Sequence, residues 1–205
     1  MARSANSILE SFLAKNDVGL EFGSGRSTLW FAQKVSALTS IEHDPVWHNK
    51  VTKELALRDL RNVDYLLVEK DVEDEKGQDA AYVRITEKFP KNSFDFILVD
   101  GAYRGSCALA SLELVRPGGL LIIDDACWFL PSNSTSPKAS ICGGPGFYAV
   151  GTIRKCSGRL ALYPDHRRNS RYSNVFQTLP MIDRLIAVSS RNIVVFQPTI
   201  CARMI

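Results

Sequence analysis

The sequence predicts an α/β fold built on a doubly wound, mostly parallel β-sheet that ends in a C-terminal antiparallel hairpin. Five short apolar runs alternate with segments of helical periodicity, the pattern of strands joined by helical crossovers. The first run leads into a glycine turn, and several runs end on acidic residues. Because ligands of such sheets bind at the carboxyl ends of the strands, the same pattern predicts where the site lies.

The composition is that of an ordinary globular chain. It has 205 residues, of which 45% are hydrophobic and 23% charged, with a net charge of +3. This length suits one domain with a substantial core, so we expect a single domain over residues 1–205. Glu10, Lys15 and Asp17 interrupt the first apolar pattern, and no later run has the length of a membrane span. We expect a cytoplasmic protein without a membrane partner.

Cysteines and basic residues exclude some classes of site. The five cysteines form no C-x-x-C pair and no Cys/His cluster, which argues against structural zinc and against a disulfide framework; they are Cys107, Cys127, Cys142, Cys156 and Cys201. The main basic run is 166–171, and the sequence pI is 8.6, below the value of about 9 typical of nucleic-acid-binding domains. A solvated loop is the favoured interpretation of this run, an anionic acceptor the second, and nucleic acid the third.

The N-terminal segment predicts a helix that covers the first strand. Its apolar residues recur at helical spacing, and Ser7 with Glu10 has the S-x-x-E arrangement of a helix start. Asn16 is the expected end of this helix. The apolar residues are Ile8, Leu9, Phe12 and Leu13.

The stretch from Asp17 to Thr28, DVGLEFGSGRST, reads as strand, tight turn and helix. Val18 to Phe22 is the strand, and Gly23 and Gly25 let the backbone turn sharply where a ligand approaches. The helix start that follows presents unpaired amides, so we expect a nucleotide-like cofactor. Thr28 replaces the third glycine of G-x-G-x-x-G, which disfavours a nicotinamide cofactor.

A second apolar run, Ala37 to Ile41, ends on Glu42. An acid about 20 residues beyond the glycine turn suits a ribose, because a carboxylate accepts hydrogen bonds from both vicinal hydroxyls. The alternative role, a helix cap, fits Asp44 before Pro45 better. The helix that follows places Trp47, Val51 and Leu55 on one face, and we expect Trp47 in the core.

The remaining runs continue the alternation. Val63 to Val68 is the third strand, and the acidic loop from Glu69 to Asp79 follows it, where Asp71 is placed to reach an adenine amino group. Tyr82, Ile85 and Phe89 indicate a helix that the turn at residues 90–93 closes.

The next strand, Phe94 to Val99, ends on Asp100, which points into the ligand crevice. A helix from Cys107 to Val115 is broken by residues 116–119, RPGG. The fifth strand, Leu120 to Ile123, ends on Asp124 and Asp125. The last strands, Leu185–Val188 and Ile193–Phe196, flank a turn at 189–192 and predict the hairpin.

Four motifs carry a family resemblance: E-F-G-S-G-R-S-T, S-I-E-H-D-P, F-D-F-I-L-V-D-G and V-R-P-G-G-L-L-I-I-D-D. In this order and spacing the chain resembles the class I S-adenosylmethionine-dependent methyltransferases, most of all the small O-methyltransferase-like members. The resemblance spans residues 17 to 126. It implies a Rossmann-like sheet and S-adenosyl-L-methionine as cofactor.

The resemblance also implies residue roles. Glu21, Gly23 and Gly25 match the motif that holds the methionine part of the cofactor, and Glu42 matches the acid that holds the ribose. Ser27 stands where the first motif often has another glycine. The expected cofactor contacts are Glu21, Phe22, Gly23, Ser24, Gly25, Ser27, Thr28, Glu42, His43, Asp71 and Asp100.

The segment from Ala126 to Val150 is rich in proline, serine and glycine, and a loop of this length is usually functional or disordered. In the family this region shapes the acceptor pocket, whereas the alternative is a surface loop whose aromatic residues only pack. The aromatic candidates for an acceptor pocket are Trp128, Phe129, Phe147 and Tyr148.

The expected function is methyl transfer to a small-molecule nucleophile, with oxygen as the expected acceptor atom. Two alternatives stay open: a nicotinamide-dependent oxidoreductase and a non-catalytic cofactor-binding module. The catalytic candidates are Asp100 and Asp125. Close carboxylates repel unless a cation or protons intervene, so one hypothesis is a Mg²⁺ ion. The slightly preferred one is that Asp100 acts as a base and Asp125 caps the next turn, without metal.

Overall fold

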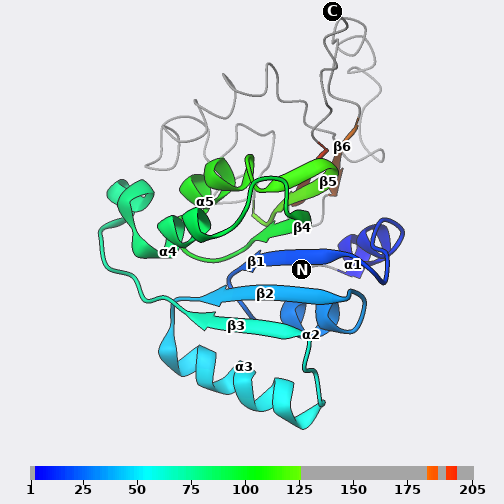
Figure 1. Ribbon diagram of the computed structural model, residues 1–205, viewed down its shortest axis with the longest axis horizontal. Coiled ribbons are helices and arrows are strands. Elements are labelled where there is room, and N and C mark those ends of the chain that lie inside the picture. The colour runs from blue at the N-terminus through cyan, green and yellow to red at the C-terminus, as the bar shows by residue number, and fades with distance from the viewer. Residues whose placement is uncertain (1–2, 126–183, 189–192, 198–205) are drawn as a thin grey trace, which may run out of the picture.

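A computed structural model of the chain describes residues 3–125, 184–188 and 193–197. Its centre is a sheet of order β3-β2-β1-β4-β5-β7-β6 (Figure 1). The first five strands run parallel, which confirms the predicted α/β sheet. The strand order changes direction between β1 and β4, the place where such sheets bind ligands. The parallel strands are β1 (Val18–Phe22), β2 (Ala37–Glu42), β3 (Val63–Leu67), β4 (Phe94–Val99) and β5 (Val115–Ile123).

Helices connect these strands and cover both faces of the sheet (Figure 1). Alternate residues of a strand point to opposite faces, so each face has its own core. One core joins Leu20 and Ile97 to α4 and α5, and the other joins Phe96 to α1 and α2. The helices are α1 (Arg3–Glu10), α2 (Arg26–Ala32), α3 (Pro45–Leu57), α4 (Ala81–Arg84) and α5 (Arg104–Ser111), with 3₁₀ turns η1 (Asp74–Asp79) and η2 (Ile85–Lys88).

Gly19 in β1 makes room for an aromatic ring of the second core. A Cβ on Gly19 would lie 2.1 Å from the Cζ atom of Phe96 in β4. The Phe96 ring stacks on Phe31 of α2 with 4.6 Å between centroids, and both side chains are fully buried. The missing side chain at position 19 therefore lets α2 pack directly on the sheet.

The prediction for the first helix was wrong at both ends. The helix begins at Arg3, so Ser7 lies inside it and does not cap its start. It ends at Glu10, because the N–H groups of Phe12 and Leu13 both donate to the Leu9 carbonyl at 3.0 Å and close the chain into a turn. Hydrophobic periodicity continued past the helix end and did not reveal this turn.

The boundary between α5 and β5 also differs from the prediction. α5 ends at Ser111, and β5 already begins at Val115, so residues 116–119 lie inside the strand. They are accommodated by a shift in register: Phe94 pairs with Val115, whereas Phe96 pairs with Leu120. A Cβ on Gly119 would lie 2.6 Å from the Asp95 carbonyl oxygen, so this excursion passes close to β4.

The strands β6 (Arg184–Val188) and β7 (Ile193–Gln197) extend the sheet, with β7 antiparallel to β5 and to β6. The connecting residues 189–192 lie outside the described residues, so the C-terminal hairpin stays a prediction. The segment 126–150 with its four aromatic candidates, the basic run 166–171 and every cysteine except Cys107 also lie outside them.

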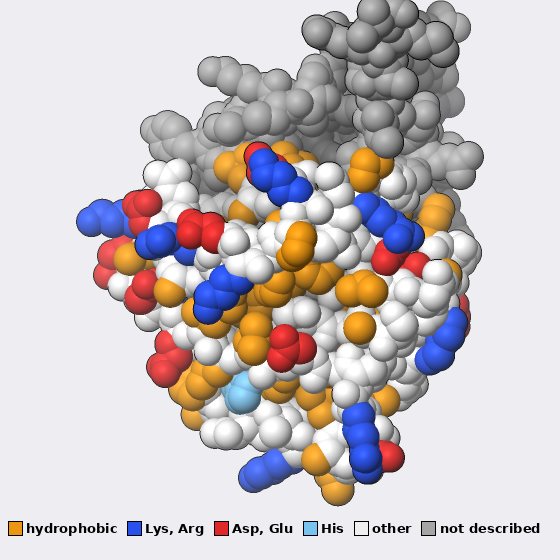
Figure 2. Space-filling model, viewed as in Figure 1, with side chains coloured by type: hydrophobic (Ala, Val, Ile, Leu, Met, Phe, Trp, Pro, Cys, Tyr) orange, Lys and Arg blue, Asp and Glu red, His pale blue; other side chains and the backbone are white. Residues whose placement is uncertain are grey.

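The surface of the described part carries both signs of charge. On the face shown in Figure 2, Lys and Arg side chains are interspersed with Asp and Glu, and hydrophobic side chains lie between them. Among the helices that the structure describes, none has both the length and the apolar character needed to cross a membrane.

Candidate cofactor site

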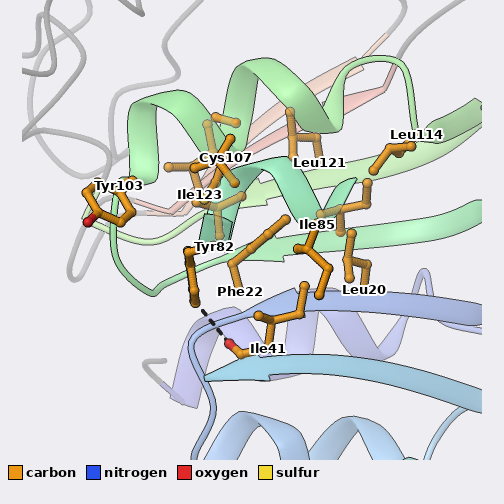
Figure 3. Close-up of a cluster of buried hydrophobic side chains, with 14 of the residues drawn as sticks. Leu20, Phe22, Ile41, Tyr82, Ile85, Tyr103, Cys107, Leu114, Leu121 and Ile123 are labelled. Carbon is orange, nitrogen blue, oxygen red and sulfur yellow. Dashed lines mark hydrogen bonds between the residues drawn. The ribbon is translucent and has the colours of Figure 1, made fainter. Parts of the chain in front are cut away.

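The glycine turn after β1 packs directly against the turn after β4. Gly23 has φ 87°, in the left-handed region that favours glycine. A Cβ on Gly23 would lie 2.5 Å from the Cα of Gly101, and a Cβ on Gly101 would lie 2.2 Å from the Tyr82 hydroxyl. The Tyr82 hydroxyl donates to the Ile41 carbonyl at 3.0 Å (Figure 3). The predicted steric role of Gly23 is therefore corrected: its side chain space is taken by backbone of the same protein.

Gly25, two residues on, is buried, but a Cβ at this position would meet no clash. The nearest atoms to a Cβ at this position are those of the Trp47 ring, at 3.7 Å. This is ordinary van der Waals contact, so a Cβ would clash at Gly23 but would fit at Gly25. A ligand held over this turn would lie beside Gly25, where the start of α2 also presents its amides.

Thr28, the residue in place of a third glycine, fastens the turn. Its hydroxyl accepts a hydrogen bond from the Gly25 N–H at 2.8 Å and donates to Glu21 Oε2 at 2.5 Å. At the position of the third glycine of the motif, Thr28 therefore stabilises the turn through its side chain.

Glu21 lies at the end of β1 with no solvent exposure. Ser40, its neighbour in β2, donates to Oε2 at 2.8 Å, whereas Oε1 has no hydrogen-bond partner among the described residues. Burial raises the pKa of Glu21 to about 7, against the lowering effect of the nearby hydroxyls of Ser27, Thr28 and Ser40. A buried carboxyl with one unpaired oxygen is a polar group suited to a ligand at the glycine turn.

Glu42, at the end of β2, is bound to the same turn. Its Oε2 accepts from the Ser24 N–H at 2.9 Å and from the Ser24 hydroxyl at 2.6 Å. Its Oε1 accepts from the N–H groups of His43 and Asp44 at 2.8 and 3.0 Å. Burial would raise the pKa of Glu42, but the hydrogen bonds from His43, Ser24 and the backbone outweigh it and lower the pKa to about 2. Glu42 is therefore an ionised acid beside the glycine turn, as predicted for a ribose-binding residue.

Two further predicted contacts flank Glu42 and the turn. His43 places Nδ1 3.0 Å from Glu42 Oε1, and its ring meets the Tyr82 ring edge to face at 5.8 Å. The Phe22 side chain is buried in the core under α4, so the backbone is the part of Phe22 that faces the turn; its carbonyl accepts from the Asp100 N–H at 2.8 Å.

The start of α3 confirms one prediction and overturns another. Asp44 caps the helix, accepting from the N–H groups of Val46 and Trp47 at 2.8 and 3.0 Å. Trp47 is 40% exposed and does not lie in the core, in contrast to Val51 and Leu55. Its Nε1 donates to the Ser24 carbonyl at 2.9 Å, because the first turn of α3 lies at the glycine turn rather than over the sheet.

Asp71 lies in the loop after β3, and it has a structural partner. Both of its carboxylate oxygens accept from the Ala81 N–H, each at 3.1 Å, at the start of α4. Asp71 therefore caps α4, and its predicted contact with adenine would add to this role.

The acids that end β4 and β5 surround one arginine. Arg104 in α5 lies 3.0 Å from the Asp100 carboxylate and 3.6 Å from that of Asp125. The same guanidinium donates to the carbonyls of Gly101, Asp124 and Asp100 at 3.2, 2.9 and 3.1 Å. Burial and the nearby Asp124 raise the pKa of Asp100 to about 6, while Arg104 opposes the shift. The positive charge of Arg104 thus offsets part of the negative charge at these strand ends.

This arrangement does not support the Mg²⁺ hypothesis. Arg104 supplies positive charge at the place predicted for a metal ion. Among the residues that the structure describes, no group of three His, Cys, Asp or Glu side chains has a metal-binding arrangement. The turn that Asp125 was predicted to cap lies beyond residue 125, outside the described part.

Sequence reasoning missed Ser40, Tyr65 and Arg104. Ser40 pairs in register with Glu21 on one side and Tyr65 on the other, so all three side chains lie in a row on one face. Register between strands distant in sequence has no local signal. Arg104 did have one, since it follows Asp100 by four residues, the spacing of a charge pair near a helix start.

Comparisons with known proteins identify the family of this chain and proteins of similar fold. A family model described as a methyltransferase domain matches residues 20–126. A methyltransferase-like protein from Silicibacter pomeroyi is 18% identical, with a TM-score of 0.56 over 98% of this chain and 90% of the other. A protein from Corynebacterium glutamicum is 10% identical, with a TM-score of 0.62 over 99% and 84%. Precorrin 8w decarboxylase from Methanobacterium thermoautotrophicum is 18% identical, with a TM-score of 0.52 over 97% and 91%.

These structural similarities, all below 25% identity, establish the fold alone. Other matched structures are longer: this chain spans 50% of one from Bacillus subtilis and 48% of one from Bacillus halodurans. A search of curated proteins found no match.

Proposed function

This chain belongs to the methyltransferase-domain family, and we therefore propose that it transfers the methyl group of S-adenosyl-L-methionine to oxygen on a small-molecule acceptor. The observation that carries the proposal is the contact between Glu42 and the glycine turn. The Ser24 N–H lies 2.9 Å from Glu42 Oε2, so the ribose-binding acid and the cofactor-binding turn are adjacent.

The residues present fit this cofactor. Three features lie at the carboxyl ends of β1 and β2. They are the space for a Cβ at Gly25, the buried Oε1 of Glu21, which has no hydrogen-bond partner among the described residues, and the ionised carboxylate of Glu42. Glu42 would hold the ribose, and Glu21 with the glycine turn would hold the methionine part. Bound S-adenosylmethionine supplies a methyl carbon activated by its sulfonium sulfur. The protein then has to align the acceptor with this carbon.

A hydroxyl acceptor must also lose a proton, and Asp100 is the proposed base. Its carboxylate lies at the end of β4, beside the turn that packs on Gly23. A pKa of about 6 allows it to accept a proton near neutral pH. Arg104, 3.0 Å away, would fix the direction of the carboxylate. We place Asp125 as the second acid of this site, with Arg104 between the two.

The family match supports methyl transfer over the two alternatives. A nicotinamide-dependent oxidoreductase is disfavoured, because the family model that matches is that of a methyltransferase domain. The fold itself leaves the reaction open, since one matched structure is described as a decarboxylase. A non-catalytic cofactor-binding module would share the glycine turn and Glu42 but would not consume the cofactor.

We further propose a single domain over the whole chain, a C-terminal antiparallel hairpin made by β6 and β7, and a cytoplasmic location. The described residues of the face in Figure 2 carry mixed charges rather than a continuous basic surface, which supports a small-molecule acceptor over nucleic acid.

Titration calorimetry with S-adenosylhomocysteine and with NAD tests the proposal directly. We expect S-adenosylhomocysteine to bind in the micromolar range and NAD to give no heat beyond dilution. Tight NAD binding without a response to S-adenosylhomocysteine would contradict it. Turnover of S-adenosylmethionine with a set of hydroxyl-bearing acceptors then separates an enzyme from a binding module.

A further inference from the structure

In the free protein, the carboxylate of Glu42 already accepts hydrogen bonds at both oxygens. It accepts four hydrogen bonds within the protein, two at each oxygen, from the N–H groups of Ser24, His43 and Asp44 and from the Ser24 hydroxyl. A carboxylate has about four lone-pair sites. A ribose hydroxyl that binds Glu42 would therefore compete with the present donors.

Of the donors to Oε2, the Ser24 hydroxyl is the one that can move alone. The other nearby side chain, His43, places Nδ1 3.0 Å from Oε1 and so approaches the opposite oxygen. The three N–H groups belong to the backbone of the glycine turn and of the entry to α3, which Asp44 caps. The hydroxyl of Ser24 turns about a single side-chain bond, and Ser24 is not fully buried. It lies 2.6 Å from Glu42 Oε2, the distance at which a ribose hydroxyl would bind.

Tyr65 offers the displaced hydroxyl a second partner. Its Oη lies 2.6 Å from Ser24 Oγ. The ring is held by His48 of α3, which stacks on it with 4.2 Å between centroids and 17° between planes. The Ser24 hydroxyl has one hydrogen, and the carboxylate of Glu42 takes it, so Tyr65 must donate to Ser24 in the free protein. If Ser24 leaves Glu42, it can donate to Tyr65 instead.

We propose that the Ser24 hydroxyl occupies the ribose-hydroxyl position on Glu42 in the free protein, and that cofactor binding redirects the hydrogen that Ser24 donates from Glu42 to Tyr65. Ser24 therefore competes with the cofactor, and Tyr65 is a positioning residue that acts only through Ser24. This inference rests on the proposed function, because it assumes a ribose at Glu42.

If the Ser24 hydroxyl competes with the cofactor, its removal should strengthen cofactor binding. Removal of a hydroxyl that only contacts the cofactor would weaken binding. Ser24→Ala removes the competing donor but keeps the backbone N–H, so S-adenosylhomocysteine should bind about fivefold more tightly. Tyr65→Phe leaves the displaced hydroxyl without an acceptor, and an unpaired donor costs more than an unfilled acceptor, so binding should weaken about threefold. The double variant should bind as Ser24→Ala does, because without the Ser24 hydroxyl there is no hydrogen bond for Tyr65 to accept.

Titration calorimetry on the full chain measures all three affinities, and thermal unfolding checks that each variant is folded. Ser36→Ala is the matched control, since the Ser36 hydroxyl bonds to the carbonyls of Asn16 and Asp17 at the opposite end of β1; it should leave the affinity unchanged. Ser24→Cys, with a weak donor, serves if the alanine variant does not fold, and it should also bind more tightly than wild type.

The outcomes separate this inference from the proposed function. If the wild-type chain does not bind S-adenosylhomocysteine, both fail. If the wild type binds and Ser24→Ala binds equally or more weakly, the competition is wrong while the proposed function stands. A Tyr65→Phe effect that persists in the Ser24→Ala background would show that Tyr65 contacts the cofactor itself, which overturns its role through Ser24.

Discussion

The guanidinium of Arg104 lies 3.0 Å from the carboxylate of Asp100, and both side chains are largely withdrawn from solvent, with 15% and 27% of their surface exposed. The pair spans one turn of chain at the end of β4, and Arg104 also reaches the end of β5 through the Asp124 carbonyl. One side chain therefore joins two strand ends and offsets part of the negative charge of the acids that terminate them.

Removal of this arginine should destabilise the protein. Arg104→Met removes the positive charge beside the carboxylates of Asp100 and Asp125, and loss of one partner of a buried ion pair costs about 3 kcal/mol. The loss should be larger at pH 8 than at pH 5, because protonation of Asp100, whose pKa is raised to about 6, relieves its repulsion with Asp124. Urea unfolding at the two pH values measures it.

Arg84→Met is the control for Arg104, since Arg84 pairs with Glu87 at 3.2 Å on the exposed surface, where such pairs contribute little. In Arg104→Met, added Mg²⁺ should raise the unfolding temperature, because the freed carboxylates are hard oxygen ligands. Equal stability of wild type and Arg104→Met at pH 8 would refute the role given to this arginine.

Glu21 should make stability fall as the pH rises. Its pKa is raised from 4.5 to about 7 in the folded protein, so between these values the folded chain holds a proton that the unfolded chain has released. The stability that this proton provides is fully present below pH 4.5 and is lost as the pH rises to 7 and above. The change amounts to about 3 kcal/mol.

Glu21→Gln, which cannot ionise, should remove this dependence. Asp100 titrates in the same direction over part of this range, so the quantity to measure is the difference in unfolding free energy between wild type and variant across pH 5 to about 8. A difference that stays constant with pH would show that Glu21 keeps an ordinary pKa.

Glu42 should dominate the affinity for the cofactor product. Glu42→Ala removes a charge-assisted partner of the ribose, and we expect S-adenosylhomocysteine binding to weaken by about 1.5 to 3 kcal/mol in calorimetry. Glu54→Ala, in α3 and paired with the exposed Arg58, is the control and should bind as wild type does. An unchanged affinity in Glu42→Ala would remove the ribose assignment.

Gly19 should tolerate no side chain unless Phe96 becomes smaller. Gly19→Ala places a methyl group 2.1 Å from the Phe96 ring, and overpacking of this kind costs about 1 to 3 kcal/mol. Phe96→Leu alone should also destabilise, through a cavity beside Phe31. The double variant should be more stable than the sum of the two single effects predicts, which chemical denaturation of all four proteins can establish.

The sequence was sufficient for the parallel strands and for the start of α3, where the signal is local. The apolar runs located all five parallel strands, and Asp44 with Pro45 located the start of α3, because strand burial and helix capping depend on residues close in the chain. The glycine turn and Glu42 were identified by spacing, and the structure brings them into hydrogen-bond contact.

The sequence was insufficient where the cause is tertiary. Trp47 has the periodicity of a core residue, but the position of α3 relative to the glycine turn leaves it exposed. Tyr65 reaches Ser24 only because the register of β1, β2 and β3 aligns them. The extension of β5 to Val115 depends on pairing with Phe94 across a shift in register. The sequence RPGG at residues 116–119 is typical of a turn and does not indicate this strand pairing.

The contact between Gly23 and Gly101 limits how this site can change in evolution. A side chain at position 23 would meet the Gly101 backbone at 2.5 Å, and one at position 101 would meet the Gly23 N–H at 2.7 Å and the Tyr82 hydroxyl at 2.2 Å. The atoms that a side chain at either position would meet in the other glycine are backbone atoms. They cannot move aside by rotation of a side chain, so the clash remains. Descendants of this protein with a side chain at position 23 must therefore also have moved the turn that carries Asp100, and with it the proposed base.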